Sequence, residues 1–220
     1  LGFRKALRVT NADQSSGAGA GDSTQIQTRI EAQNIANSGW NYTSTSSFIT
    51  FSFWVKSSVA QNFYGYIIAD DGTDQNYSFE TGSLSADTWT KVTKTIPGNS
   101  NLQFDSNNGV GFKIHITPFL GTDFTNSSVS LNSWYAYSSG IRTPDHTSTW
   151  YTTNNATFEI TGVQLEVGSV ATDFEHEPFE TTLHKCQRYY HVIFDATQQS
   201  ETYWQQAYYY NTSTLAFIKV

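Results

Sequence analysis

ITFSFWVK, residues 49–56, alternates between an apolar face and a second, mostly polar face. Every odd-numbered side chain in it is apolar, and the even-numbered ones are Thr50, Ser52, Trp54 and Lys56. Because side chains of a β-strand point alternately to opposite sides, a period of two predicts a strand with one buried face. One-sided burial is typical of antiparallel sheets, so this stretch predicts an antiparallel sheet packed on a second layer.

The same period recurs along the chain. Residues 26–32 and 110–117 alternate clearly, and weaker strand patterns occupy five further segments, 5–10, 63–69, 75–81, 88–96 and 131–138. Turns rich in Gly, Asn and Asp separate these segments. Eight or nine strands suffice for two sheets, so we expect an all-β, antiparallel β-sandwich.

The apolar positions of residues 158–167 change parity in the middle of the segment. They fall on even numbers at Phe158 and Ile160 and on odd numbers from Val163 onward. One extra residue at Thr161-Gly162, which is a β-bulge, would reconcile the two halves. We therefore expect a single bulged strand rather than two strands.

A short helix is predicted after this strand. Pro178 stands where helices favour proline, and apolar residues follow it at helical spacing: Phe179, Leu183, Cys186 and Tyr190. The remaining thirty or so residues are tyrosine-rich and strand-like but cannot bury a core alone. We expect a sandwich domain over 1–176, a linking helix over 177–190, and over 191–220 the start of a second β element or domain that is incomplete here.

Composition excludes several classes of function. The net charge is −7 and Lys and Arg form no cluster, so the phosphate-neutralising surface of a nucleic-acid-binding protein is missing. No run of about 18 apolar residues is present, and we expect no membrane insertion. Because catalytic motifs are absent from the sequence, we expect no enzyme, although Glu159 and Glu166 keep a glycosidase pair as a remote alternative.

Residues 158–190, FEITGVQLEVGSVATDFEHEPFETTLHKCQRYY, are more specific than a strand pattern. They resemble a segment common in tail-fibre and other structural proteins of tailed bacteriophages, where an ITGVQLE-VGSVATPFEHRP run precedes a helix ending in CQRYY. This chain has Asp173 and Glu177 where that segment has Pro and Arg. Upstream pieces agree in order, namely ALRVTN from Ala6, QTRIE from Gln27, FSFWVKSS from Phe51, ADTWTKVTKTIPG from Ala86 and NNGVGFKI from Asn107.

The resemblance implies a jelly roll of the carbohydrate-binding-module kind on a tail fibre or other phage appendage. We expect a structural protein of the virion, made in the host cytoplasm, that forms a homotrimer, contacts other virion proteins and attaches to host-surface glycan for host recognition. A capsid or neck fibre, spacer or decoration without glycan binding is the alternative, and a polysaccharide depolymerase is a remote one. Fold alone does not choose among them.

Aromatic side chains beside polar groups are the candidate glycan-binding residues, because pyranose rings stack on indole and phenol faces. Trp54 lies opposite the core face of its strand, unless a loop or the C-terminal tail covers it. Tyr64 and Tyr66 could form a polar aromatic surface with His115 if their strands are neighbours. The preferred group surrounds a long loop and consists of Trp134, Tyr135, Tyr137, Arg142, Asp145, Trp150 and Tyr151.

Two further expectations concern packing and metals. The preferred loop group could instead be aromatic packing at one end of the sandwich, and Trp89 is expected in the core. Asp70, Asp71 and Asp74 could offer oxygen ligands to calcium on one turn, although they lack the EF-hand spacing. Such residues are also ordinary turn formers. The five histidines and Cys186 show no zinc spacing, so no other cofactor is expected.

Overall fold

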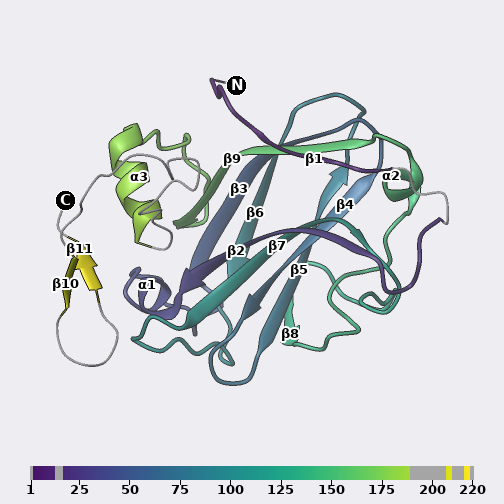
Figure 1. The fold of residues 1–220 in the computed structure, drawn as a ribbon. Helices are drawn as coiled ribbons and strands as arrows, with labels where there is room; N and C mark the ends of the chain where they lie inside the picture. The colour runs from purple at the N-terminus through teal and green to yellow at the C-terminus, as the bar shows by residue number, and fades with distance from the viewer. Residues whose placement is uncertain (1, 13–16, 189–206, 210–215, 219–220) are drawn as a thin grey trace, which may run out of the picture. The chain divides into compact units, whose positions relative to one another are not determined.

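A computed structural model describes residues 2–12, 17–188, 207–209 and 216–218 of the chain (Figure 1). The chain divides into two compact units, Leu1–Glu175 and His176–Val220. No helix in the described ranges is long and apolar enough to cross a membrane.

The first unit holds nearly all of the regular structure. Its elements in chain order are β1 (Leu7–Thr10), β2 (Ser23–Glu31), α1 (Ala32–Ala36), β3 (Phe48–Ser57), β4 (Asn62–Ala69), β5 (Gln75–Ser83), β6 (Thr90–Pro97), β7 (Val110–Leu120), β8 (Trp134–Ala136), α2 (Thr149–Thr152) and β9 (Thr157–Val167). Each strand matches a segment with the predicted alternation, and β8 is shorter than the predicted 131–138.

Two antiparallel sheets form the sandwich. One has the order β1-β9-β3-β6 and the other β2-β7-β4-β5-β8. Most consecutive strands change sheet, and only the β4–β5 and β7–β8 connections stay within one. This alternation is the connectivity of a jelly roll, with β8 added at the edge of the five-stranded sheet. The predicted all-β, antiparallel jelly-roll sandwich is confirmed.

The core between the sheets is largely aromatic. Phe51 and Phe53 of β3 are fully buried and make edge contacts with Phe79 of β5, at centroid distances of 5.8 and 6.4 Å. Phe63 of β4 meets Phe158 of β9 at 4.9 Å. Edge-to-face pairs of this kind contribute about 0.5–1.5 kcal/mol beyond the area they bury. The alternation of residues 49–56 thus places β3 correctly in the sandwich.

The predicted bulge in β9 is confirmed. Ser52 of β3 pairs with Gln164, whereas Trp54 pairs with Thr161, so β9 carries one extra residue between these pairs. Gly162 lies in this stretch with φ +58°, a left-handed conformation that favours glycine. A Cβ there would also lie 2.4 Å from the Phe3 ring. The glycine therefore serves both the bulge and the close approach of the N-terminal segment.

The second unit contains the predicted helix, α3 (Phe179–Gln187), and a short antiparallel pair, β10 (Ala207–Tyr209) with β11 (Ala216–Ile218). Lys185 of α3 forms an ion pair with Glu177, which lies just before the helix. This confirms a short helix followed by further β structure. The expected helical position of Tyr190 and the strand-like pattern of 189–194 lie outside the described residues.

Candidate functional site

Tyr66 and His115 meet on the outer face of the five-stranded sheet. β4 and β7 are neighbours, Tyr66 stands opposite His115, and the rings stack at a centroid distance of 4.2 Å with an interplanar angle of 9°. The Tyr66 hydroxyl donates to Gln25 Oε1 at 2.8 Å, and His115 Nδ1 lies 3.0 Å from the same oxygen. The structure thus joins these two residues, but their exposed fractions are only 1% and 8%.

The segment after β8 covers this face. The main-chain oxygen of Arg142 accepts hydrogen bonds from Asn76 Nδ2 at 3.0 Å and from the Tyr135 hydroxyl at 2.9 Å. The guanidinium of Arg142 lies 4.7 Å from the centre of the Phe124 ring. Phe124 and Tyr137 pack against a small apolar cluster that includes Tyr66. The expected polar aromatic surface of Tyr66 and His115 is therefore wrong, because a loop turns it into a buried network.

The pKa values of Tyr66 and His115 in this network are strongly shifted. Burial raises the pKa of Tyr66 to about 12, although the neighbouring Arg142 opposes the rise. Burial also lowers the pKa of His115 to about 4, and the charges of Arg142, Lys113 and Arg29 lower it further. Both rings are neutral near neutral pH, so the network consists of neutral hydrogen-bonding groups around one guanidinium. Such a network fixes the loop on the sheet.

The preferred loop group does not form one surface. Trp150 is fully buried, and its indole N–H donates to the Thr157 carbonyl at 3.0 Å. The Trp134 indole N–H donates to the Pro97 carbonyl at 2.7 Å, while its ring packs on Tyr77. A sugar cannot stack on Trp150, so that expectation is wrong, and both tryptophans pack inward.

The other members of the group are scattered. Tyr151 stacks on Phe119 at a centroid distance of 4.3 Å, and Asp145 accepts a hydrogen bond from Thr125 at 2.7 Å. Tyr64 is half-buried, with its ring 5.0 Å from that of His146. Sequence reasoning placed Tyr151 and Asp145 around one loop and Tyr64 on the strand of Tyr66, and each of the three packs against a different partner.

The acidic turn is held by other partners. Asp70 pairs with Lys113 at 2.5 Å, and Asp71 accepts from the main-chain N–H of Asp105 at 3.0 Å. Within the described ranges, no group of three or more His, Cys, Asp or Glu side chains could hold a metal ion. We therefore propose no calcium site at Asp70, Asp71 and Asp74.

The outer face of the four-stranded sheet carries two tryptophans that solvent partly reaches, as it also reaches Trp134 on β8. Trp54 of β3 stands between Thr161 of β9 and Lys91 of β6, and its side chain is half-buried. One row further, Lys56 lies 5.2 Å from the centre of the Trp89 ring. Trp89 is also half-buried, so the expectation that it belongs to the core is wrong. We call Trp54, Lys56, Trp89 and Lys91 the tryptophan platform.

An ion-paired carboxylate supports one side of the platform. Glu159 of β9 pairs with Lys56 at 2.5 Å and with Arg8 of β1 at 2.5 Å, and it is only 4% exposed. Burial acts to raise the pKa of Glu159, but the hydrogen bonds and charges of Lys56 and Arg8 outweigh it and lower the pKa overall. Lys56 is thus held in place between a carboxylate and an indole, which orders the platform.

Residues 168–175 bound the platform on the other side. Thr50 donates to the Gly168 carbonyl at 2.7 Å, and Thr95 donates to the Ser169 carbonyl at 3.1 Å. Thr50 and Ser52, which share the outer face with Trp54, are both buried, and Thr50 is the one bonded to this segment. A loop therefore covers part of the predicted outer face of β3, whereas Trp54 itself is half-buried. Sequence reasoning missed the two neighbours Trp89 and Lys91, because only the β3–β6 register reveals them.

The strand order and this outer face define a jelly-roll β-sandwich with an aromatic, cation-bearing platform. No family model matches the chain, and no curated protein matches it in sequence. Among solved structures, it is similar to the tripod from the baseplate of bacteriophage Tuc2009, with 10% sequence identity and a TM-score of 0.35 over 79% of this chain and 67% of that chain. The strand order, rather than this similarity, defines the fold.

Proposed function

We propose that this chain is a non-enzymatic structural protein of a phage virion, in a tail fibre or another appendage, and that its sandwich attaches to host-surface glycans through the tryptophan platform. The virion assignment is supported by the ordered sequence resemblance to phage tail-fibre proteins. The glycan assignment is supported chiefly by one observation: two half-buried indoles and two ammonium groups share one face of a rigid sheet.

The chemistry of the platform suits a carbohydrate. Indole rings offer flat apolar faces to the C–H groups of pyranose rings, and lysine ammonium groups donate to sugar hydroxyls. Each such contact is weak, and a homotrimeric fibre would multiply it because several copies engage one cell surface. Assembly as a homotrimer and contact with other virion proteins are parts of this proposal.

The test compares platform variants on an array of bacterial surface polysaccharides. We expect Trp54→Ala and Trp89→Ala each to weaken binding about tenfold, which corresponds to the loss of about 1.4 kcal/mol of aromatic contact. Thr28→Ala is the matched control, because Thr28 is exposed on β2 of the five-stranded sheet, which is not the sheet that carries the platform. Unchanged binding in both tryptophan variants would overturn the platform, and release of reducing ends from the polysaccharide would overturn the non-enzymatic assignment.

A purely structural role is the second candidate, and exposed apolar side chains favour it. Leu7, Val163, Val167 and Val170 are 53%, 42%, 49% and 73% exposed. Side chains of this kind suit contact with another virion protein rather than with a sugar. If no polysaccharide binds while Val163→Ser and Val170→Ser impair virion assembly, the structural role replaces glycan binding.

A further inference from the structure

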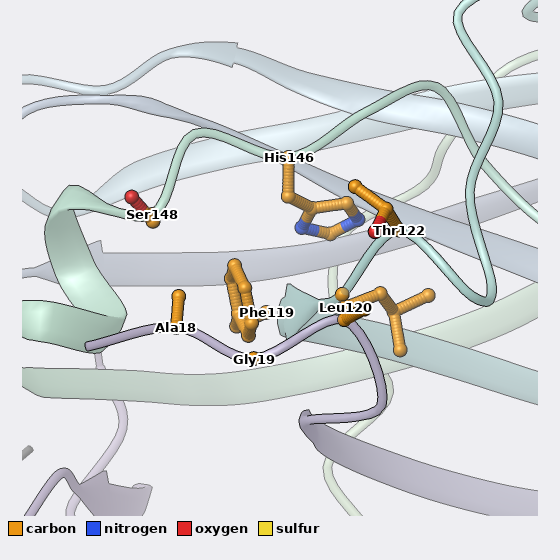
Figure 2. A pocket seen from close by; sticks show the side chains of 9 residues that line it. Ala18, Gly19, Phe119, Leu120, Thr122, His146 and Ser148 are labelled. Carbon is orange, nitrogen blue, oxygen red and sulfur yellow. The ribbon is translucent and has the colours of Figure 1, made fainter. Parts of the chain in front are cut away.

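A cavity of about 230 Å³ lies at one end of the sandwich (Figure 2). None of the residues that line it belongs to the tryptophan platform. Three segments form it: residues 18–20 before β2, residues 119–122 at the end of β7, and His146 with Ser148 before α2. Drug-sized ligands occupy pockets of about 300–1,000 Å³, so this cavity suits a smaller ligand.

The main chain around the cavity is fixed by hydrogen bonds. The Gly121 N–H donates to the Asp22 carbonyl at 2.8 Å, and the Asp123 N–H donates to the Ala20 carbonyl at 3.0 Å. A Cβ at Gly121 would lie 2.2 Å from the Ala20 carbonyl oxygen, so only glycine allows the two segments to approach this closely. The cavity is therefore preformed, which reduces the entropy lost on binding.

His146 supplies a hydrogen-bonding group without a partner. Its Nε2 lies 3.1 Å from Thr143 Oγ1, whereas its buried Nδ1 has no hydrogen-bond partner among the described residues. Figure 2 shows the imidazole at the cavity with Nδ1 on the side of Phe119 and Ser148. Burial lowers the pKa of His146 to about 3, against the charge of Asp145, so the ring is neutral. Leaving a buried polar group unsatisfied is unfavourable, and a ligand hydroxyl that bonds to Nδ1 would remove this cost.

The remaining lining combines an apolar wall with small and hydroxyl side chains. Phe119 lines the cavity, and Tyr151 stacks behind it. Thr122 and Ser148 contribute hydroxyl groups, and none of the described residues that line the cavity carries a charge. An aromatic wall, several neutral hydrogen-bonding groups and a small volume match an uncharged pyranose ring.

We infer that this cavity binds one neutral monosaccharide unit, with a sugar hydroxyl on His146 Nδ1 and the other hydroxyls near Thr122 and Ser148. The sugar class, though not the cavity itself, rests on the proposed glycan attachment. The cavity would be a second site that holds a single sugar unit, whereas the platform is open to a polysaccharide.

The experiment follows the His146 ring by NMR while the full chain is titrated with glucose, galactose, mannose and N-acetylglucosamine. We expect at least one sugar to shift the His146 ring nitrogens saturably, with glucuronic acid at least tenfold weaker. Ala18→Leu fills the exposed mouth of the cavity and should weaken binding at least tenfold. Trp54→Ala is the matched control and should leave the His146 shifts unchanged.

The outcomes separate this inference from the proposed function. If no sugar moves the His146 signals while polysaccharide binding stays sensitive to Trp54, the cavity inference is wrong and the platform stands. If His146 responds but Trp54→Ala has no effect on polysaccharide binding, the platform is wrong and the cavity stands. Glucuronic acid binding as tightly as glucose would overturn the assignment to neutral sugars.

Discussion

Acidification should destabilise the sandwich through two buried histidines. The pKa of His115 is lowered from 6.5 to about 4 and that of His146 from 6.5 to about 3, in both cases mainly by burial. The unfolded chain therefore binds more protons than the folded one between these values. The stability that the neutral rings contribute is complete above about pH 6.5 and declines as the pH falls toward the folded pKa values.

The size of the effect follows from these pKa values. At about pH 5 a histidine with an ordinary pKa is almost fully protonated in the unfolded chain, while both rings remain largely neutral in the sandwich. Linkage then gives a loss of about 2 kcal/mol per histidine between about pH 7.5 and pH 5, or about 4 kcal/mol together. That is a large part of the stability of a typical domain.

Urea unfolding followed by tryptophan fluorescence at several pH values measures this loss. We expect His115→Gln to remove about half of the pH-dependent loss, because one of the two titrating rings is gone. Gln25→Ala is the control: it removes the shared acceptor of Tyr66 and His115 without removing a titratable group, so stability falls at every pH while its pH dependence stays. Equal losses in His115→Gln and the unmodified chain would refute this account.

Four further substitutions test the packing and the platform. Gly162→Ala should lower the free energy of unfolding in urea by about 2–3 kcal/mol, because the added Cβ meets Phe3. Gly82 also has a positive φ, +76°, but open space around it, so Gly82→Ala should cost only about 1 kcal/mol. Equal costs of the two substitutions would contradict the clash with Phe3. Trp150→Ala should cost about 3–5 kcal/mol, and a loss under about 1 kcal/mol would show that Trp150 is not a core residue. Trp54→Ala should cost less than about 1 kcal/mol by the same measurement, because a half-buried outer side chain adds little to the core; a larger loss would mark it as structural.

Local patterns predicted the strands well because alternation records which face of a strand is buried. Phe51 and Phe53 lie in the core as their spacing required. The bulge at Gly162 was also predictable from nearby residues, because the parity change and the glycine together identify it. These features depend on neighbours within a few residues.

The candidate sites were predicted less well, because the outer face of a strand is polar whether solvent or a loop lies over it. Alternation correctly placed Tyr66 and His115 outside the core, yet the segment around Arg142 buries them. Trp134 and Trp150 are aromatic residues near a loop, and nothing local distinguishes a stacking platform from core packing. The cavity at His146 joins segments more than a hundred residues apart, so no sequence window contains it.

The sequence by itself determined that this chain is an all-β sandwich with a bulged strand at 158–167 and a helix after Pro178. Strand periodicity and proline placement are short-range effects of backbone geometry and burial. Only the tertiary structure decided which aromatic residues remain accessible, because accessibility depends on strand register and on loops that arrive from distant parts of the chain. Trp54 lies beside Lys91 because β3 pairs with β6, and Tyr66 is buried because a loop packs over it.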